Sequence, residues 1–112
     1  MFVEADRGAA RVIRENLERL GLTGAVVEQR DVMAVLREQR ARKRRTDLVL
    51  CDLARIDPYE VAASWPDIPI LGYTNHTDTS GLRAAREAGL DQVVARSALA
   101  ERAPQLVEEL VT

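Results

Sequence analysis

Asp52 is the residue in this sequence whose position most strongly suggests chemistry. It follows the segment DLVLC at residues 47–51, whose continuous apolar run predicts a strand buried on both faces. A carboxylate at the mouth of such a strand is often a reactive group. Three roles are open to it. It could accept a phosphoryl group, it could be the remnant of such an acceptor, or it could be a strand-end residue that caps nearby amides.

The elements that must position Asp52 alternate along the chain. Strands are predicted in five segments, each followed by a helical segment: MFVEAD, AVVEQ, DLVLC, PILGY and QVVA. The last helix is predicted to start at Pro104, because the residue before a proline avoids the helical region, and residues 97–103 are then an irregular turn. The first helix is predicted to end at Gly21 and to bury one face, formed by Val12, Ile13, Leu17 and Leu20.

Five short strand–helix units predict a parallel sheet with helices on both faces. The expected fold class is three-layer α/β with a doubly wound, five-stranded sheet, and the flavodoxin-like order 2-1-3-4-5 is preferred over the Rossmann-like order. A length of 112 residues suits a single α/β domain over residues 1–112. In either order the carboxyl ends of the strands share one edge, where the candidate site residues are Glu4, Asp6, Asp31, Asp52, Thr74 and Arg96.

Composition excludes several classes of function. The formal net charge is −2, so no global field recruits nucleic acid or an anionic membrane, and the basic run RARKRR at residues 40–45 is interpreted as a solvated helix end. No apolar stretch approaches the roughly 18 residues of a membrane span. The single cysteine, Cys51, indicates a reducing, cytoplasmic environment. No metal-ligand spacing and no hydrolase triad is present around His76, the only histidine.

The chain resembles a response-regulator receiver domain, most specifically from residue 47 to its end. The segments that carry the resemblance are DLVLCDL, PILGYTNH and AAREAGLDQVVARSAL, and the opening FVEADRGAARVIRENLERLG also fits. The resemblance implies that Asp52 is the phosphorylated aspartate and that Thr74 is the hydroxyl residue that senses phosphorylation.

The sequence departs from that family where the family binds metal and phosphate. The acidic pair that holds Mg²⁺ corresponds to Glu4 and Ala5, with Asp6 one residue further on. The family's lysine is Arg96, and its cis-bonded proline is Ser97. We therefore interpret the phosphorylation site as degenerate, with weak Mg²⁺ binding at most and no other cofactor.

The leading functional prediction is a non-catalytic, receiver-like domain that acts through a protein partner or as a homo-oligomer. The alternative is a working receiver that is phosphorylated on Asp52. Under the leading prediction Arg96 pairs with the Asp52 carboxylate at rest, which lowers the nucleophilicity of that carboxylate.

A second resemblance covers residues 2–50, which look like part of a Rossmann-like, S-adenosylmethionine-dependent rRNA guanine methyltransferase. That resemblance implies that Glu4 holds the ribose hydroxyls and that Asp31 pairs with the adenine. The family's glycine-rich loop and Asp-Pro-Pro-Tyr segment are missing, so useful S-adenosylmethionine binding is not expected, and residual binding through Glu4 and Asp31 is the second alternative. The two resemblances also allow a chimera, natural or engineered, with a fusion point near residues 45–50 and no evolved activity.

Overall fold

The structure, a computed structural model, describes residues 2–3, 7–22, 26–27, 37, 47–54 and 56–111. Predictions that fall on Glu4, Asp6 and Asp31, and on the basic run at 40–45, lie outside these described residues.

A parallel sheet forms the middle layer of the fold. Its three longer strands lie in the order β3 (Val49–Asp52), β4 (Ile70–Thr74) and β5 (Gln92–Ala95). Two shorter strands, β1 (Phe2–Val3) and β2 (Val26–Val27), are described over two residues each, and β1 pairs in parallel with both β2 and β3. Strand β3 therefore has a neighbour on each side.

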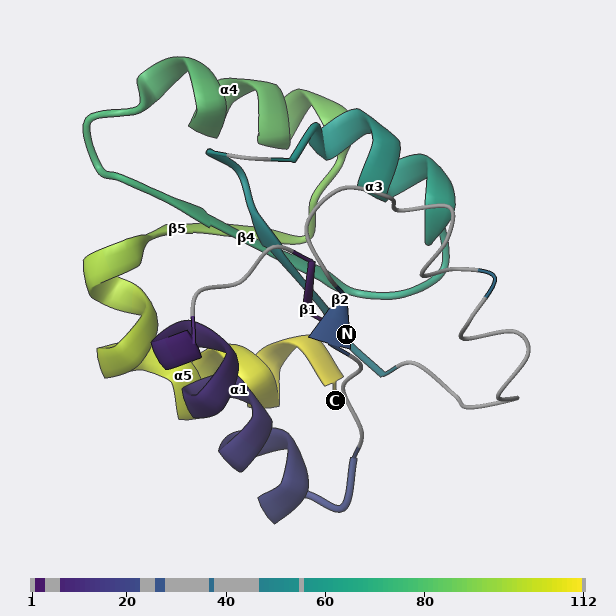
Figure 1. The fold of residues 1–112 in the computed structure, drawn as a ribbon, viewed down its shortest axis with the longest axis vertical. Helices are drawn as coiled ribbons and strands as arrows, with labels where there is room; N and C mark the ends of the chain where they lie inside the picture. Colours follow the sequence, from purple (N-terminus) through teal and green to yellow (C-terminus); the bar gives the residue numbers. More distant parts are fainter. Residues whose placement is uncertain are drawn as a thin grey trace.

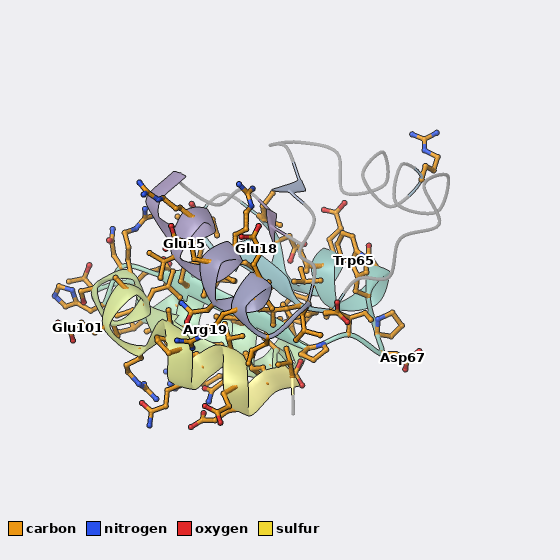
Figure 2. The ribbon with its side chains drawn as sticks, turned by 90° about the horizontal axis from the view of Figure 1, so that it is seen from below. Glu15, Glu18, Arg19, Trp65, Asp67 and Glu101 are labelled. Carbon is orange, nitrogen blue, oxygen red and sulfur yellow. The ribbon has the colours of Figure 1, made fainter. Side chains whose placement is uncertain are left out.

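Helices cover both faces of this sheet. Figure 1 shows α1 (Arg7–Arg19) and α5 (Arg96–Val111) on one face, with α3 (Pro58–Ser64) and α4 (Thr79–Ala88) on the other. In the view from below, α1 and α5 lie side by side in front of the strands (Figure 2). The described part of the chain is thus a three-layer α/β arrangement, as predicted. None of its helices is long and apolar enough to cross a membrane.

The apolar run that leads into Asp52 is buried on both faces. Leu48 and Leu50 belong to the core cluster under α1 and α5, whereas Val49 and Cys51 belong to the cluster under α3 and α4. Successive side chains of a strand point to opposite faces, so this alternation is what a fully covered strand requires. The prediction that all four are buried is confirmed.

Helix α5 differs from its prediction. It starts directly at Arg96 and contains Pro104, so both the irregular turn over residues 97–103 and the helix start at Pro104 were wrong. A proline inside a helix costs about 3 kcal/mol, because it removes one hydrogen bond and crowds the preceding turn. Burying a large apolar side chain stabilises by about 1.5–3 kcal/mol, and α5 buries a helical stripe of four residues: Leu99, Ala103, Leu106 and Val107.

The end of α1 corrects a second expectation. Gly21 has a φ of 74°, and the Leu22 amide donates to the Leu17 carbonyl oxygen at 2.9 Å, which closes the helix as the sequence predicted. Leu20, however, lies beyond the last helical residue and is 43% exposed, so it does not share the buried face of Ile13 and Leu17.

Candidate functional site

The carboxylate of Asp52 lies at the carboxyl end of β3, between neighbouring strands, and is only 1% exposed. Its Oδ1 accepts a hydrogen bond from the Ala54 amide at 3.1 Å. Its backbone carbonyl accepts one from the Ile56 amide at 3.0 Å. The bond from Ala54 orients the carboxylate, so the Asp52 side chain does cap one nearby amide.

Arg96 reaches this carboxylate from the first turn of α5. Its Nη2 lies 3.5 Å from Asp52 Oδ2, and its side chain is 41% exposed. The guanidinium therefore lies between a buried carboxylate and the solvent. An ion pair with one exposed partner contributes little stability by itself, but it compensates a charge that would be costly to bury alone. The structure thus brings together two of the predicted site residues.

Tyr73 is a third member of this group, and the sequence analysis missed it. It is buried in β4 and lies opposite Asp52 in the strand register. The Arg96 guanidinium carbon lies 5.2 Å from the centre of its ring, within the range of a cation–π contact. The only signal in the sequence is an aromatic residue directly before Thr74. Its neighbours are set by the pairing of β3 with β4.

Thr74 is the last residue of β4, one residue beyond the predicted end of this strand, and is buried. Its Oγ1 donates to Asp78 Oδ2 at 2.9 Å, and Asp78 is the N-cap of α4. Asp78 Oδ1 also accepts from the Gly81 amide at 3.0 Å and from the Ser80 hydroxyl at 3.3 Å. The Gly81 bond first, and then the Thr74 bond, lower the pKa of Asp78 below its usual value. The hydroxyl is therefore tied to the start of α4, which the sequence did not predict.

The side chains of Tyr73 and Thr74 project from opposite faces of β4. Tyr73 and Leu71 belong to the cluster under α1 and α5. Gly72 faces the other way, because a Cβ there would meet Leu53 and Leu90 of the α3 and α4 cluster. Thr74 shares the face of Gly72 by strand alternation. The edge therefore carries the Asp52–Arg96–Tyr73 group on one side and the Thr74 hydroxyl on the other.

Replacing the α4 cap should destabilise the protein measurably. Asp78→Ala removes the acceptor of the Gly81 amide and the partner of Thr74, so we expect the melting temperature at pH 7 to fall by a few degrees. Asp78→Asn is the matched control, because asparagine caps helices equally well without a charge.

The acid range gives a second check on the same cap. A lowered pKa means that the charged Asp78 stabilises the fold above its unfolded pKa of 3.8, and that this contribution is lost as the pH falls through the lower folded value. The difference between wild type and Asp78→Ala should therefore shrink in melts below that pH. An equal difference at pH 7 and in acid would contradict a role for the charge.

The described residues do not by themselves form a magnesium site. Among them, no three histidine, cysteine, aspartate or glutamate side chains gather closely enough to hold a metal. Asp52 is the one acidic residue of the predicted phosphorylation site that is described, and its Oδ2 faces the Arg96 guanidinium. Glu4 and Asp6 would have to supply the remaining oxygens, and both lie outside the described residues. Weak Mg²⁺ binding therefore stays a prediction.

Solved structures provide the comparison with known proteins. No family model and no curated protein matches the chain. The receiver domain of NtrX from Brucella abortus is similar at a TM-score of 0.71 and 18% identity, over 98% of this chain and 95% of that chain. The signal receiver domain of a response regulator from Bermanella marisrubri gives 0.72 and 17%, over 99% and 95%. The Mn²⁺-bound form of the response regulator Rcp1 gives 0.69 and 16%, over 98% and 91%.

At these identities the likeness shows the fold, which is the flavodoxin-like α/β fold of receiver domains. The receiver resemblance predicted from the sequence therefore holds for the architecture. The likeness spans both halves of the chain, and nothing in it supports the methyltransferase resemblance or a fusion near residues 45–50. The S-adenosylmethionine contacts predicted for Glu4 and Asp31 lie outside the described residues.

Proposed function

We propose that this chain is a response-regulator receiver with Asp52 as the phosphoryl acceptor, acting through contacts with a protein partner rather than as an enzyme. The observation that most supports the proposal is the position of the Asp52 carboxylate, at the carboxyl end of an interior parallel strand with a guanidinium 3.5 Å from its Oδ2. Phosphoryl transfer needs a positioned nucleophile and a cation that meets the charge of the transferred group.

The geometry favours Oδ2 as the attacking atom. Oδ1 is held by the Ala54 amide, whereas Oδ2 faces the guanidinium of a partly exposed arginine. Oδ2 would form a bond to the donor's phosphorus while the bond from phosphorus to the leaving oxygen breaks, giving an acyl phosphate. The Arg96 guanidinium must turn from Oδ2 towards the phosphoryl oxygens as the donor arrives, and it can then contact them. Mg²⁺, which the resemblance implies, would neutralise further charge, and Glu4 or Asp6 would have to help hold it.

The proposal includes the finer predictions on architecture and location. It assumes one domain over residues 1–112, the full strand order 2-1-3-4-5 and a cytoplasmic protein. The pairings of β1 with β2 and β3 support this strand order, and the receiver fold supports the cytoplasmic location. The bond from Thr74 to the α4 cap offers a route by which events at the strand ends reach a helix surface.

A phosphorylation-impaired receiver is the second candidate. The observation that favours it is the burial of Asp52, which is 1% exposed beneath the Arg96 guanidinium. If the ion pair persists, a phosphodonor cannot reach Oδ2, and the domain would act only as a binding module.

Intact-mass measurement after incubation with a small phosphodonor and Mg²⁺ separates the two candidates. A working receiver should gain one phosphoryl group that is stable in acid and labile in base, and Asp52→Asn should abolish the gain. Asp67→Asn is the matched control, because Asp67 is an exposed aspartate that precedes β4. It points outward, at the opposite end of the molecule from Glu101 of α5 (Figure 2). No gain in the wild type would reject the proposal and favour the impaired receiver.

A further inference from the structure

Tyr73 has a geometry that ordinary core packing does not require. Its ring is fully buried in β4, and it is the register partner of Asp52 on β3. Arg96 extends over this ring and reaches Asp52 at the same time, with its Cζ 5.2 Å from the ring centre and its Nη2 3.5 Å from the carboxylate. One guanidinium therefore contacts a buried ring and a buried carboxylate.

We propose that Tyr73 is the positioning residue for Arg96, and that its ring makes this site specific for arginine over lysine. The proposal rests on the proposed function, in which Arg96 meets the charge of the phosphoryl group. A partly exposed arginine on a flexible stem samples many rotamers, and a single ion pair restrains it weakly. A ring fixed in the core removes much of that freedom, because a planar guanidinium can lie over the ring and still direct a nitrogen at Oδ2.

A lysine could not satisfy both contacts equally well. Its ammonium is a compact, strongly hydrated point charge without a planar surface to lay over the ring. Arg96 and Tyr73 therefore form one unit, and Arg96 does more than supply the positive charge of the family's lysine. A purely structural role for Tyr73 would instead require only an apolar side chain of similar size.

The first test reads the contact itself and does not depend on phosphorylation. The Nε–Hε signal of Arg96 in a ¹H–¹⁵N spectrum should be displaced by the ring and should exchange slowly with water, unlike that of exposed Arg83. Tyr73→Phe should preserve both properties, since the ring remains. Tyr73→Leu should move the signal towards that of Arg83 and raise its exchange on the order of tenfold. A signal that is the same in all three proteins would overturn the proposal.

The second test measures how fast Asp52 gains a phosphoryl group. Tyr73→Leu should lower the rate on the order of tenfold, Tyr73→Phe should retain most of it, and Arg96→Lys should resemble Tyr73→Leu. In an Arg96→Ala background, Tyr73→Leu should have no further effect, because Tyr73 acts through Arg96. A further loss in that background would show a structural role and reject the proposal.

The outcomes also separate the two proposals. If the wild type gains no phosphoryl group, the proposed function fails, while the Arg96 signal still decides whether Tyr73 holds the guanidinium. If Tyr73→Leu does not fold, Arg96→Lys keeps the test decisive, because a partly exposed side chain is changed and the core is left intact. A wild-type rate in Arg96→Lys would then contradict the specificity for arginine.

Discussion

Leu50→Ala is expected to lower the free energy of unfolding by about 2–5 kcal/mol. Leu50 is completely buried in β3, opposite Phe2 on one side and Leu71 on the other, and it packs into the cluster under α1 and α5. Its truncation removes apolar contacts and leaves a cavity that neighbouring strands cannot fill without breaking their pairing. Urea denaturation followed by circular dichroism measures the loss.

Leu20→Ala is the matched control, because it deletes the same atoms from a side chain that is 43% exposed. Its effect should stay near 0.5 kcal/mol, the usual size for surface substitutions. A loss of that size for Leu50→Ala would mean that β3 is not an interior strand. The placement of Asp52 at the mouth of an interior strand would then be wrong as well.

The stability of the protein should fall steeply in alkali because of Cys51. Burial first, and then the charges of Asp52 and Asp57, raise the pKa of the Cys51 thiol from 9.0 to about 12. The folded state therefore keeps a proton that the unfolded chain releases above pH 9. The thiol's contribution to stability is complete below pH 9 and is lost as the pH rises towards 12. At about 1.4 kcal/mol per pH unit, the free energy of unfolding falls by on the order of 4 kcal/mol over this range.

Comparison with Cys51→Ala isolates this effect from the other groups that titrate in alkali. The free energy of unfolding should fall more steeply between pH 9 and pH 12 in the wild type than in the variant. Parallel curves for the two proteins would rule out a shielded thiol. Since Cys51 is the only cysteine, alkylation followed by intact mass gives an independent reading. At pH 8 the folded protein should react on the order of a thousandfold more slowly than the denatured chain.

Local patterns in the sequence were sufficient for the architecture around Asp52. The unbroken apolar run over residues 48–51 predicted a strand buried on both faces, and its side chains do alternate between the two core clusters. The predicted helix start at Pro104, by contrast, was wrong. The free-energy cost of placing a proline inside α5 is smaller than the gain from burying the apolar stripe along this helix. That gain depends on tertiary packing, which local sequence patterns do not show.

The candidate site could be predicted in part. Asp52 and Arg96 were both expected at the strand ends, and the ion pair between them was foreseen. Asp78 was not singled out, because its bond to Thr74 depends on the turn that carries the chain from β4 to α4. Glu4, Asp6 and Asp31 stay predictions, since they lie outside the described residues.

The sequence by itself determined that Asp52, Thr74 and Arg96 lie at strand ends and that the strand before Asp52 is buried on both faces, because apolar runs and their alternation are local properties of the chain. Only the tertiary structure decided which of those strand-end groups meet. The register of β3 against β4 sets Tyr73 beside Asp52, and the start of α5 at Arg96 brings a guanidinium over both. A slip of one residue in that register would turn Tyr73 to the other face of the sheet, so this contact arises from the pairing of strands and has no local signature in the sequence.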